Sequence, residues 1–211
     1  MTELLKKHYA IICQRAVEAL NRNRFQAQYV KDSKEALAAA LALIPAKATV
    51  GMGGSATLAT LGIKETLLAQ GNQVFNHQGL PSHEAMLVRR QELTADVFLA
   101  SSNALTLEGE LINVDGMGNR VAAMTFGPQR VILVVGANKI VPDEAAGRQR
   151  IELFAGPMNA ERLDKKTPCR VTGSCMHCNS PERICMVTSI MHKAPMGADF
   201  HVIIVGEELG F

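Results

Sequence analysis

The chain has 211 residues, of which 47% are hydrophobic and 20% are charged. This is enough apolar sequence for one large core or two small ones, so we exclude disorder as its main state. The 22 basic residues nearly balance the 20 acidic ones and are scattered, which gives no electrostatic basis for binding nucleic acid or an anionic membrane. No apolar run reaches the roughly 18 residues that a membrane span needs. Because the N-terminus also lacks a signal-peptide cleavage site, we expect a cytoplasmic protein with a small-molecule or protein partner.

Two helices are expected before the first strand. Apolar residues recur at helical spacing from residue 3 to about residue 29, which predicts an amphipathic helix with Cys13 on its apolar side. Ser33 then precedes an alanine-rich run that Pro45 ends, which predicts a second helix.

Short apolar runs and helical patterns alternate in the rest of the chain. Strands are expected at residues 48–52, 73–76, 96–101, 130–136 and 201–206. Helices are expected at residues 55–70, 83–93 and 144–154. This alternation is typical of an α/β fold with an open, mostly parallel sheet flanked by helices. We predict one domain, made of N-terminal helices (1–46), an α/β core (47–160) and a cysteine-rich segment with the final strand (161–211).

A glycine-rich turn lies between the first predicted strand and the helix after it. Residues 51–56 match the loose dinucleotide fingerprint G-x-G-x-x-A, but no acidic residue follows at the end of the next strand, as a nicotinamide site would require. Backbone N–H groups at a helix N-terminus favour an anion, so we predict that a phosphate or carboxylate binds here, at Gly51, Gly53, Gly54 and Ser55. The alternative is a tight turn in which Ser55 caps the helix.

Polar residues follow two of the predicted strands, at the edge where open α/β sheets bind ligands. Glu108 is our candidate general base or nucleophile, with Asp115 as a second carboxylate, and Lys139 is expected to face the same crevice. The candidate ligand-binding side chains nearby are Asn103, Thr106, Asn113, Asn119 and Asn138. The alternatives are a plain hairpin that turns at Asp115 and Gly116, and a solvated lysine.

Four cysteines lie close together near the C-terminus, at positions 169, 175, 178 and 185. They lie among turn-forming residues, so four thiolates can surround one ion or cluster. A single C-x2-C flanked by two isolated cysteines is unlike the paired knuckles of zinc ribbons, which favours a 4Fe-4S cluster over zinc or over uncoordinated redox thiols. His177, inside the C-x2-C, is a candidate to replace one cysteine or to support a ligand.

Several motifs together resemble the LUD-domain family, named for lactate utilisation, and in particular its shorter cysteine-bearing branch. The motifs lie at residues 50–55, 103–109, 118–122, 126–128, 135–141 and 167–178, so the resemblance covers nearly the whole chain. It implies a fold similar to ribose-5-phosphate isomerase, glucosamine-6-phosphate deaminase and the CoA transferases, with a ligand crevice near the glycine turn.

The resemblance also implies a function. LUD proteins are linked to the oxidation of lactate or related hydroxy acids beside an iron–sulfur partner protein, which predicts an oxidoreductase subunit or redox accessory protein that binds a small anionic metabolite. In the look-alike isomerases and CoA transferases a glutamate performs the chemistry, and Glu108 is the nearest candidate here. The alternatives are a non-redox isomerase or acyl-transferase with structural zinc, and a carboxylate-binding module without turnover. A homodimer is expected from family habit.

Overall fold

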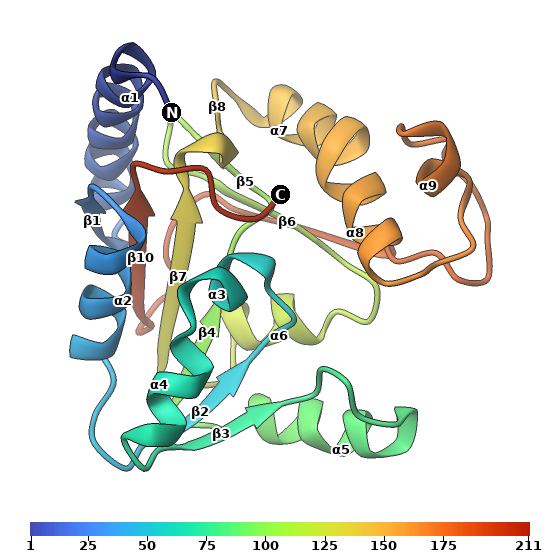
Figure 1. The fold of residues 1–211 in the computed structure, drawn as a ribbon, viewed down its shortest axis with the longest axis horizontal. Helices are drawn as coiled ribbons and strands as arrows, with labels where there is room; N and C mark the ends of the chain where they lie inside the picture. The colour runs from blue at the N-terminus through green and yellow to red at the C-terminus, as the bar shows by residue number, and fades with distance from the viewer.

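The computed structural model describes residues 1–211 and contains two β-sheets flanked by helices (Figure 1). The main sheet has six strands in the order β1-β10-β7-β4-β2-β3, and every neighbouring pair is parallel. Its strands are β1 (Gln26–Val30), β2 (Thr49–Met52), β3 (Gln73–Asn76), β4 (Val97–Ala100), β7 (Arg130–Gly136) and β10 (Asp199–Val205). The predicted open, parallel α/β sheet is therefore confirmed.

Both faces of the main sheet are covered, because alternate residues of its central strands belong to different hydrophobic clusters. Ile132 of β7 packs in one cluster with α2 (Ser33–Ala42), α3 (Ala56–Leu61) and α4 (Ile63–Ala69). Leu133 packs in the other with α1 (Glu3–Arg22) and α6 (Asn119–Thr125). Helix α5 (Ser82–Glu92) contacts β2, β3 and α6. None of the helices combines the length and the apolar character that crossing a bilayer requires.

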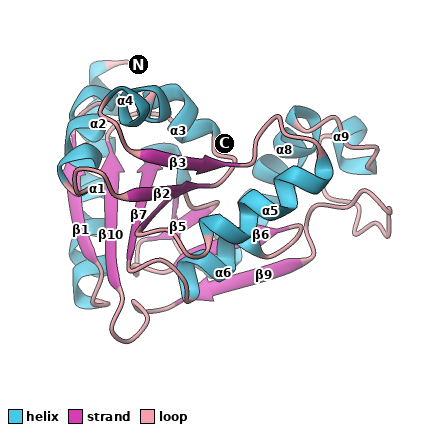
Figure 2. Cartoon of the chain, turned by 90° about the horizontal axis from the view of Figure 1, so that it is seen from below, coloured by secondary structure: helices cyan, strands magenta, loops and turns pink.

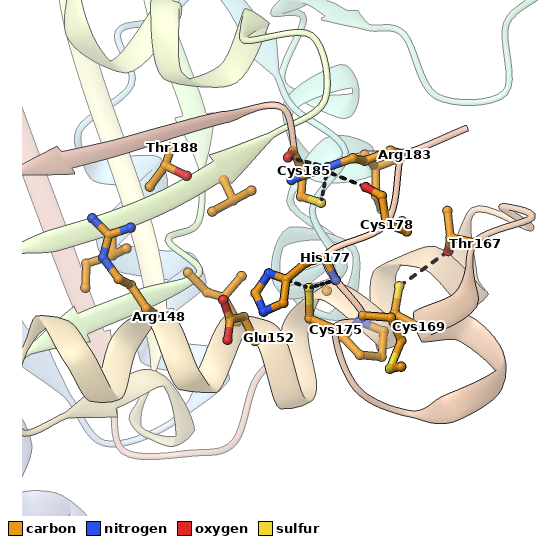
Figure 3. Close-up of a pocket in the computed structure, with 17 residues that line it drawn as sticks. Arg148, Glu152, Thr167, Cys169, Cys175, His177, Cys178, Arg183, Cys185 and Thr188 are labelled. Atoms are coloured by element: carbon orange, nitrogen blue, oxygen red, sulfur yellow. Dashed lines mark hydrogen bonds between the residues drawn. The ribbon is translucent and has the colours of Figure 1, made fainter. Parts of the chain in front are cut away.

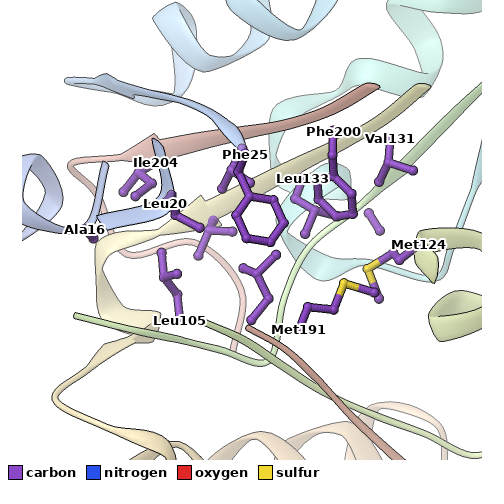
Figure 4. Close-up of a cluster of buried hydrophobic side chains, with 14 of the residues drawn as sticks. Ala16, Leu20, Phe25, Leu105, Met124, Val131, Leu133, Met191, Phe200 and Ile204 are labelled. Carbon is purple, nitrogen blue, oxygen red and sulfur yellow. The ribbon is translucent and has the colours of Figure 1, made fainter. Parts of the chain in front are cut away.

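The cluster against α1 forms the larger core (Figure 4). Phe25 and Phe200 meet edge to face there, with ring centroids 5.1 Å apart. Cys13 is fully buried in this cluster, and burial raises the pKa of its thiol to about 12. The expectation that Cys13 lies on the apolar side of its helix is confirmed.

The second sheet has four strands in the order β8-β5-β6-β9. They are β5 (Ala104–Thr106), β6 (Leu111–Asp115), β8 (Ile140–Val141) and β9 (Val187–Met191). β5 and β6 form an antiparallel hairpin, and β9 brings the cysteine-rich segment alongside β6. The segment that carries the cysteines is thus joined to the α/β core by strand pairing.

A long helical stretch connects the second sheet to the cysteines. α7 (Glu144–Arg150) continues through a π-helix (Ile151–Ala155) into α8 (Gly156–Arg162), and the short α9 (Pro168–Thr172) follows. Figure 2 shows α8 and α9 at the end of the molecule opposite β1 and β10.

Three sequence-based boundaries were wrong. The first helix ends at Arg22, because Arg24 adopts a left-handed conformation (φ 69°) and the next residues pair with β10 as strand β1. The helix predicted at residues 55–70 breaks at Gly62, whose φ of 61° is also left-handed. The expected hairpin is present, but it joins β5 to β6 and turns at Gly109 instead of at Asp115 and Gly116.

Candidate functional site

All four C-terminal cysteines line one pocket of about 140 Å³ (Figure 3). Cys169 comes from α9, and Cys175, Cys178 and Cys185 come from the loop between α9 and β9. Each of the four is a free, half-buried thiol. The structure therefore brings together the four residues that the sequence predicts as metal ligands.

The π-helix fixes one end of the cysteine loop. The N–H of Gly156 donates to the carbonyl of Ile151, one residue further back than in an α-helix, and Pro157 has no N–H to offer. Both effects leave the carbonyl of Glu152 free, and it accepts a hydrogen bond of 2.8 Å from the N–H of Cys175. A local irregularity of the helix thus positions a candidate ligand.

Arg183 ties the remaining part of the loop together. Its Nε donates to the sulfur of Cys185 over 3.1 Å, and its Nη1 donates to the carbonyl of Cys178 over 2.8 Å. Elsewhere in the loop the N–H of His177 donates to the sulfur of Cys175 over 3.4 Å. These hydrogen bonds hold Cys175, Cys178 and Cys185 in place around the pocket.

The distances between candidate ligand atoms can be compared with those that a single zinc ion requires. Around one tetrahedral zinc ion, with Zn–S bonds of about 2.3 Å, neighbouring sulfurs are about 3.8 Å apart. The group of three ligand atoms that lie within 4.8 Å of one another is formed by Glu152, Cys175 and His177, with no second cysteine among them. The four sulfurs are therefore more open than a four-thiolate zinc site, whereas Glu152, Cys175 and His177 have the spacing of a site for one ion.

A second site is formed where strands of the main sheet end. Lys139 lies in a 3-10 turn (Ala137–Lys139) directly after β7 and is only 3% exposed. Its Nζ donates to the hydroxyl of Thr57 over 3.0 Å and to the hydroxyl of Ser101 over 3.1 Å. Thr57 follows β2 and Ser101 follows β4, so the carboxyl ends of three strands meet at this lysine, as expected for a ligand crevice in an open α/β sheet.

The site around Lys139, called the crevice below, carries positive charge without an equal negative charge. Burial, and then the neighbouring charges of Arg150 and Arg120, lower the pKa of Lys139 to about 7. Arg120 pairs with Asp115, but Arg150 donates only to the backbone carbonyls of Asn138 and Asn103. Neither Lys139 nor Arg150 has a carboxylate within ion-pair distance, which favours an anionic ligand between them.

The predicted glycine turn has a structural role in this fold. A Cβ at Gly51 would lie 2.8 Å from the carbonyl oxygen of Glu92, so close packing on α5 requires glycine there. Ser55 caps α3 by accepting a hydrogen bond of 3.3 Å from the N–H of Leu58, which confirms the alternative interpretation of this residue. Gly53 donates to Leu99 over 3.3 Å, and Gly54 lies beside Gln78. Anion binding by this turn stays a prediction.

Glu108 lies outside the crevice. It is at the tip of the β5–β6 hairpin, where it faces Arg15 of α1 at 3.8 Å, and the two side chains are 68% and 61% exposed. The partners of Lys139 are the hydroxyls of Thr57 and Ser101, so Glu108 does not bond to this lysine. The other predicted ligand-binding residues are distributed between the Arg120 network (Asn103 and Asn113), the C-terminal tail (Asn138), the hairpin (Thr106) and the first turn of α6 (Asn119).

Several residues of the two sites were missed in the sequence. Thr57 and Ser101 are ordinary hydroxyl residues of a helix start and a strand end, and only the strand order places them beside Lys139. Arg150 and Glu152 lie in an amphipathic helix, where charged residues normally face solvent. Arg120 could have been found from the sequence, because it lies in the family motif at residues 118–122 and has polar residues around it.

The fold and its sites define an α/β protein with a candidate anion crevice at the carboxyl edge of its main sheet and a candidate metal centre beside its second sheet. The family model of the LUD domain matches residues 13–205, so the chain belongs to the LUD domain family. Membership supports a role related to lactate utilisation.

A solved structure shares this fold. The chain is similar to the crystal structure of a DUF162 family protein from Deinococcus radiodurans, with a TM-score of 0.53 and 16% identity, over 93% of this chain and 97% of that one. Among curated proteins none matches the sequence.

Proposed function

We propose that the protein is a cytoplasmic iron–sulfur protein of lactate or related organic-acid utilisation. In this proposal Cys169, Cys175, Cys178 and Cys185 hold a 4Fe-4S cluster, which supplies one-electron transfer, and the crevice around Lys139 binds a small organic anion. A second iron–sulfur protein would exchange electrons with it. The observation that carries the proposal is that all four cysteines line one pocket.

The chemistry of the pocket supports a cluster. Its soft ligands are thiols, their spacing is wider than a four-thiolate zinc site needs, and N–H groups donate to two of the sulfurs. Hydrogen bonds to cluster sulfurs and the charge of Arg183 are the levers by which a protein tunes such a centre. The residues of this chain would thus hold the cluster, exclude water from part of it and set its potential.

The charges of the crevice support an anionic substrate. Arg150 is close enough to Lys139 to lower its pKa, and neither has a carboxylate partner, so a carboxylate from an organic acid would supply the missing negative charge. Guanidinium and ammonium groups that are already partly buried bind a carboxylate more strongly than exposed ones do.

The test of the cluster is anaerobic purification followed by an absorption spectrum and analysis of iron, sulfide and zinc in one sample. We expect broad absorption near 400 nm and about four irons per chain. Cys178→Ser should lose both, whereas Cys13→Ala, which changes the cysteine in the core, should keep both. A colourless protein with one zinc per chain would overturn the cluster.

The second candidate centre is zinc bound by Glu152, Cys175 and His177, which the short spacing of these three groups favours. It would be structural and would leave the crevice as the only chemical site. The two centres predict opposite variant effects. Glu152→Gln and His177→Ala would remove the zinc and spare a cluster, whereas Cys169→Ser would remove a cluster and spare the zinc.

A further inference from the structure

The amine of Lys139 has surroundings that suit covalent chemistry. Its only hydrogen-bond partners are two uncharged hydroxyls, of Thr57 and Ser101. Ion pairing would hold a lysine in its charged form, but no carboxylate lies within ion-pair distance of this one. A buried lysine in such a setting is available as a nucleophile.

We propose that Nζ of Lys139 condenses with the carbonyl carbon of a 2-oxo acid whose carboxylate is held by Arg150. A 2-oxo acid places a carbonyl directly beside a carboxylate, and the crevice places an amine near a guanidinium that lacks an acidic partner. This use of Lys139 rests on the proposed binding of an organic acid. It also fits the reaction class, because oxidation of a 2-hydroxy acid produces a 2-oxo acid.

The protonation state of the amine is suitable for attack. Only a neutral amine has the lone pair that adds to a carbonyl, and an exposed lysine is almost fully protonated at pH 7. Burial and two nearby guanidinium groups lower the pKa of Lys139 to about 7, so a large fraction is neutral at that pH. The positive charge of Arg120 and Arg150 disfavours a third positive charge beside them.

The step is balanced without an oxidant or reductant. The lone pair of Nζ forms a C–N bond to the carbonyl carbon, and one proton passes from Nζ to the carbonyl oxygen to give a neutral carbinolamine. A second proton, from solvent, then joins this oxygen, the C–O bond breaks, the oxygen leaves as water, and a singly charged iminium remains on Lys139. The hydroxyls of Thr57 and Ser101, which already bond to Nζ, are placed to donate and accept these protons.

The C-terminal tail covers this amine. The carbonyl of Leu209 accepts a hydrogen bond of 3.1 Å from Thr57, and the carbonyl of Gly210 accepts one of 3.1 Å from Asn138. A Cβ at Gly210 would lie 2.6 Å from the hydroxyl of Thr57 and 3.4 Å from Nζ of Lys139. These contacts shield Lys139 from solvent, so a 2-oxo acid can reach this amine only if Gly210 and Phe211 shift.

The experiment is reductive trapping. The full-length protein, with its metal in place, is incubated with pyruvate and then with sodium borohydride, and peptides are mapped by mass spectrometry. We expect one reduced pyruvyl adduct per chain, on Lys139, and its loss in Lys139→Met and in Lys139→Arg. Lys34→Met, which changes an exposed lysine of α2, should keep the adduct. Absence of an adduct, or an adduct that persists in Lys139→Met, would overturn the proposal.

Two further readouts separate this inference from the proposed function. Lactate has the carboxylate of pyruvate but no carbonyl, so thermal stabilisation by lactate tests anion binding alone. If lactate and pyruvate both stabilise the protein and borohydride traps nothing, the anion site stands and the covalent role of Lys139 is wrong. If pyruvate is trapped on Lys139 in a protein that contains zinc and no iron, the covalent role stands and the cluster is wrong.

Discussion

Arg120 connects three segments around the crevice through one guanidinium group. It donates to Asp115 over 2.9 Å, to Asn113 over 2.8 Å and to Asn103 over 2.7 Å. Asp115 is only 7% exposed, so it would keep a buried charge without its ion-pair partner if the guanidinium were removed. We expect Arg120→Ala to lower the free energy of unfolding by about 3 to 5 kcal/mol, measured by urea denaturation.

The matched control is an arginine in an exposed ion pair. Arg148 pairs with Glu144 one helical turn away, and the two side chains are 51% and 40% exposed. Arg148→Ala should cost about 0.5 kcal/mol or less, because solvent screens such a pair. Equal losses of unfolding free energy in Arg120→Ala and Arg148→Ala would show that the hydrogen bonds of Arg120 do not stabilise the fold more than an exposed ion pair does.

Lys139 should make stability depend on pH. Its pKa falls from the ordinary lysine value of 10.5 to about 7 in the folded protein, so the unfolded chain binds more protons between these two values. The free energy of unfolding therefore rises with pH in this window, by up to about 1.4 kcal/mol per pH unit from this group. Below pH 7 the amine is protonated in both states and the contribution no longer changes.

The measurement is urea unfolding of the protein and of Lys139→Met at pH 7, 8 and 9. Other groups titrate equally in both proteins, so the difference between the two isolates Lys139. The difference should favour the variant most at pH 7 and shrink as the pH rises. Parallel curves would mean that Lys139 keeps an ordinary pKa in the folded protein.

The β5–β6 hairpin packs on α1 through a glycine that no other residue can replace without movement. Gly109 has a φ of 80°, and a Cβ there would lie 2.6 Å from the backbone of Ala19. Gly71 has a similar φ of 83° but open space around it. Gly71→Ala should therefore cost only the conformational strain, about 1 to 2 kcal/mol, whereas Gly109→Ala should cost more, because α1 or the hairpin must also shift. Thermal or urea unfolding compares the two, and equal costs would contradict the close contact.

The π-helix gives a prediction for the loop that it anchors. Pro157→Ala restores an N–H that competes with Cys175 for the carbonyl of Glu152. Losing one hydrogen bond, worth about 1 kcal/mol, should speed amide exchange in residues 173–186 about fivefold. Hydrogen exchange with mass spectrometry measures this, with Pro142→Ala as a control outside the loop. Unchanged exchange in this loop would show that the carbonyl of Glu152 does not hold it.

The predictable elements are those whose hydrophobic pattern in the sequence matches the burial of their residues in the structure. β7 reads as an unbroken apolar run, Val131 to Val135, because both of its faces are covered. β1 was mistaken for the end of the first helix. It is an edge strand of only five residues, and its few apolar residues also match the helical spacing of the segment before it. A hairpin was expected here with its turn at Asp115 and Gly116, because polar residues such as Asn113, which pairing with Arg120 buries, are typical of turns.

The candidate sites were predictable in part for a related reason. Lys139 and the cysteines were found because each lies in a local sequence context that signals chemistry. Thr57 and Ser101 reach Lys139 only through the order of strands β7, β4 and β2, which no local pattern contains. Arg150 comes near Lys139 because helix α7 packs back over the turn after β7, where it donates to the carbonyl of Asn138. Glu108 was favoured because it follows a strand, but β5 belongs to the second sheet, and its end faces α1.

On the scale of the whole molecule, the two sites depend on different parts of the structure. The crevice is built from strand ends of the main sheet, whose two large clusters contain no residue between 167 and 186. The cysteine pocket lies between the α7–α8 helix and the second sheet, and its loop is held by a few hydrogen bonds. A ligand that binds the folded loop should therefore stabilise the loop, whereas the main sheet should fold without this ligand.

Removal of the metal tests this independence. If the proposed metal centre is present, anaerobic treatment with a chelator should raise amide exchange in residues 167–186 to that of a locally unfolded segment, because the metal bonds would supply most of what orders the loop. β7 and β10 should stay protected, since their neighbours and both covering clusters remain. Trapping of pyruvate on Lys139 should also continue in the metal-free protein. Loss of protection in β7 together with the loop would mean instead that the metal centre and the main sheet fold as one unit.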